Sequence, residues 1–306
     1  MEDYNKIIES LGVRFVRSKN IRIIQPLTVE NYYDVTNTIM LVNKGEISFG
    51  EERHKVNEGD MLFIPGGRMA SITYGKFNPV KLTNEDLLNN RDKFLGINPN
   101  PENNQEFDNY SYVSFEAKVF DSVNFFASLD ISAFVISNNT HLANIISETV
   151  KEDHYEIAGK DRVIKINTER IVIEIIRHVL QKRLFVEQLA TNSTYFKDPR
   201  LLDIFGFIKK NLGGDLSNKV LANVANVSED YVGQYFKMLT GINPQDYIEY
   251  QRMEMAVNLL RTSKKSIREI GREVGYKDTA YFCRRFKMMF GIPAGKMRRR
   301  ETLMNL

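Results

Sequence analysis

Apolar residues recur every three to four positions in two short stretches near the carboxyl end of the chain, within residues 266–298. The first stretch begins after Ser266, a good N-cap, and its apolar stripe comprises Ile267, Ile270, Gly271 and Val274. Gly275 interrupts the pattern where the end of a helix favours positive φ. A second helix, capped by Asp278, would then bury Phe282, Phe286 and Met289. The pattern predicts two helices joined by a tight turn.

The same pattern occurs once more about fifty residues earlier, within residues 216–260. Its short stripe comprises Leu221, Val224 and Ala225, and Ser228 caps the next helix. In that helix Val232 and Phe236 correspond to Phe282 and Phe286, and the endings FKMLTG and FKMMFG also match. The repetition predicts two helix-turn-helix units. A helix over Gln245–Arg261, about 25 Å long, would join them.

This region, from about residue 201 to residue 300, resembles the DNA-binding domain of the AraC/XylS family of bacterial transcription regulators. The stretches LANVANVSEDYVGQYFKMLTGINPQDYIEYQRMEMAVNLL and SIREIGREVGYKDTAYFCRRFKMMFGIP carry the resemblance. The sequence departs from the family pattern at packing or turn positions, namely Gly271, the segment 292–294 and Met297. Double-stranded DNA is therefore the expected partner.

The resemblance places base-reading side chains on the second helix of each unit. In the first unit these positions are Asp230, Gly233 and Gln234; in the second they are Thr279, Ala280, Cys283 and Arg284. Gln suits adenine and Arg suits guanine, so Gln234 and Arg284 are the expected specificity residues. The cations expected on phosphates are Lys237, Arg285, Lys287 and Arg298.

The amino-terminal part alternates apolar and polar residues in short runs separated by glycines, which is typical of strands. Expected strands include residues 39–42, 46–49, 61–64, 71–74, 110–120 and 131–136. Such spacing predicts a small β-barrel, and the phrase VNEGDMLFIPGG resembles the cupin-like sensor barrels often fused to this DNA-binding domain. The inward side chains, and so the candidates for binding a small effector, are Tyr33, Met40, Phe49, Phe63, Arg68 and Tyr74. His54 is isolated, so neither a metal site nor a cofactor is expected.

Helical periodicity follows the expected barrel over residues 140–154 and 167–184, with a helix at 84–94 inside a polar excursion. In the family such helices commonly pair two subunits, so a homodimer is expected. The basic stretch around Phe15 reads as an edge strand with solvated cations or as a mobile arm, and we favour the strand. The fold class is thus α+β, with a cupin-like barrel and two helices over 1–185, a linker over 186–199, and an all-α domain with two helix-turn-helix units over 200–306.

Charge divides along the same boundary. Residues 196–306 contain 20 Lys and Arg against 12 Asp and Glu, whereas the whole chain carries only +3. A basic carboxyl-terminal domain suits contact with phosphates. The chain has one cysteine, no apolar run near the length of about 18 residues that a membrane span requires, and a polar start without a signal peptide, so a cytoplasmic protein without disulfides is expected.

The residues bear on three classes of function. No nucleophile elbow, phosphate loop or paired-carboxylate motif occurs, which argues against an enzyme. A regulator controlled by an effector in the barrel fits best, and a ligand-independent regulator whose barrel serves only dimerisation has the same sequence pattern. RNA polymerase is a further candidate partner. The choice between activator and repressor stays open, because it depends on where the binding site lies relative to a promoter.

Overall fold

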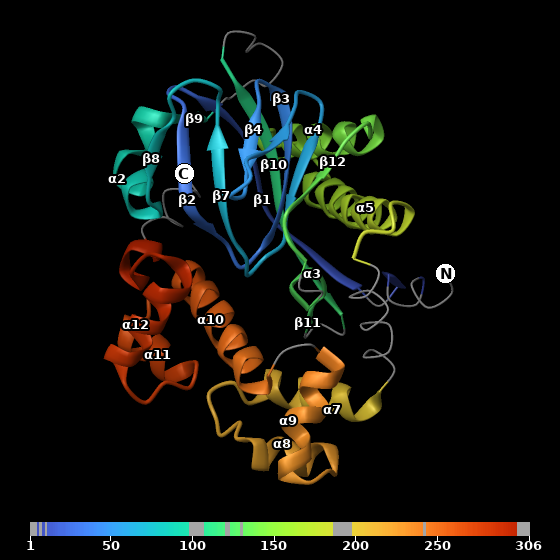
Figure 1. The fold of residues 1–306 in the computed structure, drawn as a ribbon, viewed down its shortest axis with the longest axis vertical. Helices are drawn as coiled ribbons and strands as arrows, with labels where there is room; N and C mark the ends of the chain where they lie inside the picture. The colour runs from blue at the N-terminus through green and yellow to red at the C-terminus, as the bar shows by residue number, and fades with distance from the viewer. Residues whose placement is uncertain are drawn as a thin grey trace.

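In the computed structural model, the residues described are 5, 8–9, 11–97, 107–119, 123–128, 131–185, 198–240 and 243–298. The amino-terminal region contains two β-sheets with helices beside them, and the carboxyl-terminal region is entirely helical (Figure 1). The predicted linker 186–199 lies almost wholly outside the described residues.

One sheet has seven strands and forms the centre of the amino-terminal region. Its order is β12 (Phe134–Ile136), β6 (Met61–Ile64), β3 (Asn37–Lys44), β10 (Asn109–Val119), β1 (Leu11–Ile23) and β9 (Leu95–Ile97), with β11 (Val123–Asn124) paired to β10. The second sheet has the order β5 (His54–Val56), β4 (Ile47–Phe49), β7 (Met69–Tyr74), β2 (Leu27–Tyr33) and β8 (Val80–Leu82). The predicted sheet-rich domain is confirmed, and over the described residues its strands form two sheets that do not close into one barrel.

The seven-stranded sheet is buried on both faces. Successive side chains of each strand point to opposite sides of the sheet, so neighbouring residues of one strand belong to different cores. On β3, Ile39 and Leu41 join a core beneath the helices, whereas Met40 and Val42 join the core between the two sheets. Strand β6 divides in the same way. This two-sided burial explains why β3 and β6 read as continuous apolar runs instead of alternating.

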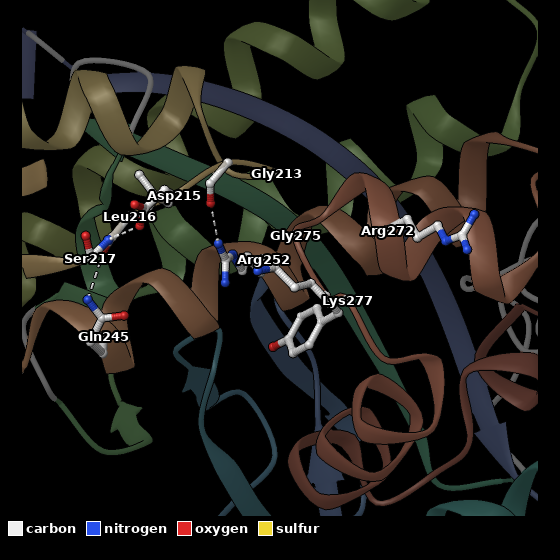
Figure 2. A pocket seen from close by; sticks show the side chains of 11 residues that line it. Gly213, Asp215, Leu216, Ser217, Gln245, Arg252, Arg272, Gly275 and Lys277 are labelled. Carbon is white, nitrogen blue, oxygen red and sulfur yellow. Dashed lines mark hydrogen bonds between the residues drawn. The ribbon is translucent and has the colours of Figure 1, made fainter.

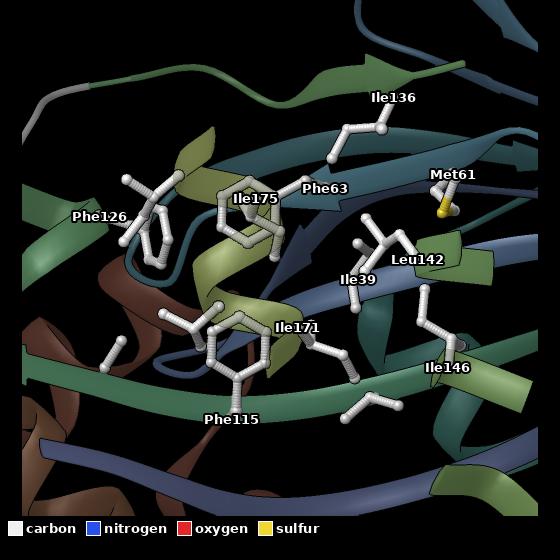
Figure 3. Packing of buried hydrophobic residues seen from close by; sticks show 14 of the residues in the cluster. Ile39, Met61, Phe63, Phe115, Phe126, Ile136, Leu142, Ile146, Ile171 and Ile175 are labelled. Atoms are coloured by element: carbon white, nitrogen blue, oxygen red, sulfur yellow. The ribbon is translucent and has the colours of Figure 1, made fainter. Parts of the chain in front are cut away.

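Helices α4 (Thr140–His154) and α5 (Lys160–Gln181) pack on the outer face of the large sheet (Figure 1). Figure 3 shows Leu142 and Ile146 of α4, and Ile171 and Ile175 of α5, among side chains of the sheet. The shorter helices are α2 (Asn84–Phe94) and α3 (Phe125–Ser128). Both α2 and α4 have the predicted bounds, whereas α5 begins seven residues before the predicted start at Asn167, because Gly159 at φ 87° supplies its N-cap.

The basic amino-terminal stretch is a strand, as favoured, but it does not lie at an edge. Strand β1 pairs with β10 along most of its length and with β9 at its end. Its cations are not simply solvated either: Arg17 is buried with Asp34 at 2.5 Å, and Arg14 bonds Glu116. Paired charges are what allow polar side chains to be buried within a strand.

The helical region comprises α7 (Pro199–Lys210), α8 (Asn218–Ala225), α9 (Glu229–Thr240), α10 (Pro244–Thr262), α11 (Ile267–Glu273) and α12 (Thr279–Phe290). Helices α8 and α9 form the first predicted helix-turn-helix unit, and α11 and α12 form the second. Between them α10 runs as the long connecting helix (Figure 1). It exceeds its predicted bounds by one residue at each end.

Candidate DNA interface

Local sequence signals set the ends of the helices in the second unit. The Ser266 hydroxyl accepts from Glu269 N, and the Glu269 carboxylate accepts from Ser266 N, which is a complete capping box. Gly275 has φ 91°, and Asp278 caps α12 by accepting from Tyr281 N. Of the predicted buried positions on α12, Phe282 and Phe286 have no exposed surface, while Phe290 takes the buried place expected for Met289. The unit is therefore folded around α12 as the sequence predicted.

The first unit repeats this construction. Asn226 adopts the left-handed conformation at φ 52° and ends α8, so it has the same helix-terminating role as Gly275 in the second unit. Leu221, Ala225, Val232 and Phe236 are buried in a second helical core. Helices α9 and α12 consequently bury corresponding faces. The opposite face of each helix is the one that can contact a ligand.

The predicted base-reading positions lie on the outer faces of these two helices. On α9, Asp230 and Gln234 are exposed and Gly233 is half-buried; on α12, Ala280 and Arg284 are exposed and Thr279 and Cys283 are half-buried. Lys237 and Lys287, predicted on phosphates, are exposed one turn further along. The two sets lie at corresponding places, fifty residues apart. Their assignment to bases and phosphates stays a prediction.

Two of the four predicted phosphate cations have partners within the protein. Arg285 makes a two-pronged ion pair with the Glu249 carboxylate on α10, which raises the pKa of Arg285. Arg298 donates to Lys265 O. Because Glu249 also accepts from Tyr276 Oη, the carboxylate ties both α12 and its preceding turn to the connecting helix. These contacts give Arg285 a structural role that the sequence did not indicate.

A cleft of about 900 Å³ lies between the two units, above α10 (Figure 2). Its wall includes the α7–α8 loop, the α11–α12 turn and Arg252 of α10. Arg252 donates from Nε to Leu212 O at 2.9 Å and from a terminal nitrogen to Gly214 O at 3.0 Å, so it fixes the α7–α8 loop. A Cβ on Gly275 would lie 2.7 Å from Leu212 O, which shows how closely the two units meet there.

The second unit also packs against the amino-terminal domain. Tyr33 and Val35, at the end of β2, belong to the same core as Phe282, Phe286 and Phe290. The Tyr33 ring lies edge-on to Phe290 with centroids 4.8 Å apart. Lys118 of β10 forms an ion pair of 2.8 Å with Glu254 of α10, and Lys296 pairs with Glu85 of α2. The amino-terminal domain therefore holds the second unit directly, and the first unit through α10.

Comparison with known proteins agrees with this arrangement. A family model described as a helix-turn-helix domain matches residues 221–300. An HTH-type transcriptional regulator of Haemophilus influenzae is 23% identical over 269 residues, which cover 86% of each chain. ToxT of Vibrio cholerae O395 has the same fold over 96% of this chain and 99% of its own, with a TM-score of 0.54 at 13% identity.

The lactose operon transcription activator of Staphylococcus xylosus decides the family, because it is 31% identical over 186 residues, 55% of this chain and 67% of that protein. The chain belongs to the AraC/XylS family. As an AraC/XylS member it is a DNA-binding transcription regulator, and the residues matched by the family model include both α9 and α12. The Haemophilus influenzae and Staphylococcus xylosus relatives are transcription regulators.

The six effector candidates of this AraC/XylS regulator do not form one set. Met40, Phe49 and Tyr74 line the core between the sheets, but Phe63 faces the helices on the opposite side. Tyr33 belongs to the domain contact. Phe49 and Arg68 meet at a cavity of about 550 Å³ near the edge of the two sheets, where burial lowers the pKa of Arg68. The alternation rule could not distinguish the two faces of a strand that is buried on both.

Other side chains near α9, α12 and the cleft were not singled out from the sequence. They are Glu249 and Arg252 on α10, Arg272 and Lys277 beside the cleft, and the exposed Tyr231, Met238, Tyr281 and Met288. The fifty-residue period could have identified the last four, since they form two corresponding pairs. Within the described residues there is no helix long and apolar enough to cross a membrane, and no grouping of His, Cys, Asp and Glu that could hold a metal.

Proposed function

We propose that this regulator binds a specific DNA sequence with α9 and α12 and that a small effector, held in the amino-terminal domain, changes that binding. The contact of Tyr33 with Phe290 is the observation that supports this control. A ligand that displaced the end of β2 would disturb the core of the second unit. Interfaces packed as densely as this one shift between discrete arrangements instead of deforming gradually.

The cavity beside Phe49 and Arg68 is our candidate effector site. Arg68 is followed directly by β7, and β7 pairs with β2 by Tyr33↔Met69 and Tyr32↔Ala70. The site and the domain contact are thus joined by one strand ladder. Glu30, Glu51 and Glu52 also line the cavity, so it offers both charge signs as well as aromatic surface to a polar metabolite.

A two-stage measurement on the full chain tests this proposal. First, a duplex is selected from a random pool; failure to select any sequence would remove the basis for sequence-specific binding. Second, metabolites are screened by melting temperature and then by their effect on affinity for that duplex. We expect Arg68→Gln to abolish both effects, and Tyr33→Ala to keep the melting shift while losing the effect on DNA. A ligand that acts on DNA affinity equally in Tyr33→Ala would contradict this route of control.

A second candidate function, regulation without an effector, has support of its own in α5. Val163 and Ile166 are 40% and 43% exposed, and half-buried Ile173 continues the same helical face. An amino-terminal domain that only dimerises would need such a surface and no cavity. We propose a homodimer through α5 in either case, so dimerisation alone does not choose between the two functions.

Sedimentation tests the dimer. Ile173→Asp should give monomers with unchanged circular dichroism, whereas Ile176→Asp should unfold the domain, because Ile176 is 3% exposed and packs on the sheet. Lys219→Asp, at an exposed position of α8 in the carboxyl-terminal domain, is the control and should remain dimeric. A wild-type chain that sediments as a monomer at tens of micromolar would contradict the proposal.

A further inference from the structure

The cleft between the two units extends to both α9 and α12. At one end Gln245 Nε2 donates to Asn218 Oδ1 at 3.3 Å, and the Asn218 amide is 3.6 Å from where a Cβ on Gly233 would lie. At the other end the ring of Tyr276 is 6.0 Å from that of Tyr281, in the first turn of α12. The cleft therefore runs from beside α9 to beside α12.

Figure 2 shows the lining side chains in a row, with Ser217 and Gln245 at one end, Arg252 between, and Arg272 at the other. An elongated cleft of this kind fits a strand of nucleic acid better than a compact metabolite. Its exposed cations are Arg272 and Lys277. One carboxylate, Asp215, also lines it; hydrogen bonds from Ser217 lower the pKa of Asp215, and the nearby charge of Lys277 adds to that shift.

The geometry of duplex DNA determines which part of the duplex would face this cleft. Two helices that read successive major-groove segments on one side of a duplex are about one helical turn, about 34 Å, apart. Midway between them the duplex turns its minor groove, flanked by sugar-phosphate backbone, toward the protein. No major-groove base edge is available there.

We propose that the cleft seats the DNA backbone between the two half-sites, with Arg272 and Lys277 as its phosphate contacts and Arg252 as the residue that holds the cleft open. This site rests on the proposed binding of DNA by α9 and α12. It implies that the spacer between half-sites is recognised through backbone position and groove width and not through base contacts.

The test uses the full chain and a duplex selected as above, in which neutral methylphosphonates replace the phosphates midway between half-sites. Each neutralised phosphate changes the slope of log K against log salt by about 0.9, which at 0.1 M salt corresponds to roughly eightfold in affinity. Arg272→Gln with Lys277→Gln should therefore bind roughly sixtyfold more weakly on every sequence, with a salt slope lower by about 1.8.

Methylphosphonates should weaken the wild type and leave the double variant unchanged. Lys182→Gln, on the amino-terminal domain, is the matched control and should behave as wild type. Unchanged wild-type affinity on the modified duplex would overturn the cleft site while leaving DNA binding intact. Because that measurement needs no variant, it decides the question even if the double variant folds poorly. Absence of any duplex binding would instead overturn the proposed function.

A second, independent observation concerns exposed apolar side chains. Among the described residues of the carboxyl-terminal region, the large apolar side chains that are well exposed are Tyr231 at 45%, Met238 at 62%, Tyr281 at 47% and Met288 at 68%. They form two pairs at corresponding positions of α9 and α12. Each pair flanks a predicted reader, Gln234 or Arg284, at i−3 and i+4, and the Arg284 guanidinium lies 5.9 Å from the Tyr281 ring.

Exposed aromatic and thioether groups repeated on two reading helices suit apolar contact with thymine methyl groups, the one apolar feature of the major groove. We infer that Tyr231 and Tyr281 contact thymine methyls in equivalent places of the two half-sites, and that Tyr281 also positions Arg284. This too rests on the proposed function.

Replacing single thymines by deoxyuridine removes only the methyl group and gives the test. Wild type should lose roughly fourfold at one thymine in each half-site, the effect of one buried methyl-sized group. Tyr281→Ala should be insensitive at its own position and keep the loss at the other, and Tyr231→Ala should show the reverse. Asn223→Ala, an exposed change on α8, serves as the control. Equal sensitivity of wild type and both variants would overturn the inference without touching DNA binding itself.

Discussion

The ion pair between Lys118 and Glu254 gives a quantitative test of the domain contact. The two side chains are 25% and 9% exposed and their charged atoms are 2.8 Å apart, while Gln251 Nε2 donates to the other carboxylate oxygen at 3.3 Å. Breaking a buried pair by removing one partner costs about 3 to 5 kcal/mol, because it leaves an uncompensated charge. Since Lys118 is partly exposed, we expect Lys118→Met to lose about 3 kcal/mol of unfolding free energy at pH 8.

The loss should depend on pH, and its sign follows from the carboxyl group. Burial raises the pKa of Glu254, and the charge of Lys118 opposes this shift. Without Lys118, the folded protein retains the proton at pH values where the unfolded chain has already released it. Stability then falls as pH rises above the unfolded pKa of about 4.3, by at most about 1.4 kcal/mol per pH unit. The loss should accordingly be small at pH 5.

Urea unfolding at pH 5 and pH 8 measures both effects. Adding Glu254→Gln to Lys118→Met should restore most of the stability at pH 8, because the buried charge is gone. Glu116 loses its 3.5 Å contact with Lys118 in these variants but keeps its ion pair with Arg14. Lys55→Met, at a side chain that is 68% exposed, is the control and should change stability by less than about 0.5 kcal/mol. An equal loss at the two pH values would refute the reasoning.

Three further predictions concern the DNA-binding units. Arg284→Ala should relax the preference at one or two base pairs by about 1 to 3 kcal/mol, measured by comparing selected sites; an unchanged preference with lower affinity would move the specificity residue elsewhere. Lys287→Ala should weaken all sequences alike and lower the salt slope by about 0.9, measured by titration at several salt concentrations. Gly275→Ala should lower the free energy of unfolding by about 2 kcal/mol or more, since φ is 91° and the new Cβ would meet Leu212 O; Gly295→Ala, where nothing lies within 4 Å, should be nearly neutral.

The carboxyl-terminal region could be predicted closely because its signals are local. Ser266, Gly275 and Asp278 each set a helix end through their own backbone or side chain, and those ends are where the sequence placed them. The recurrence of the pattern about fifty residues apart gave a second, matching set of signals for a helix-turn-helix unit. Partners that come from distant parts of the chain gave no such signal: nothing near Arg285 in the sequence shows that Glu249 will bind it.

The amino-terminal region was harder for a physical reason. A strand covered on both faces loses the alternation that would show which side chains share a cavity, so Phe63 and Met40 looked equivalent although they point to opposite faces. The central position of strand β1 was hard to predict because its charged residues are typical of a solvated edge strand. The fold instead buries charges in pairs such as Arg17 with Asp34. Closure of the sheets into a barrel depends on pairing between distant strands, and no local pattern reports it.

The unequal attachment of the two units bears on how such a regulator could be controlled. The core that contains Tyr33 includes residues of α10, α11 and α12, whereas the core of the first unit, among the described residues, comprises residues between the start of α7 and α10. A movement of β2 would therefore act first on the second unit and change its spacing from the first through α10. Because two readers must be about one helical turn apart to bind together, a small change in spacing weakens binding without altering either reading face. Control by spacing would leave the preferred bases of each half-site unchanged.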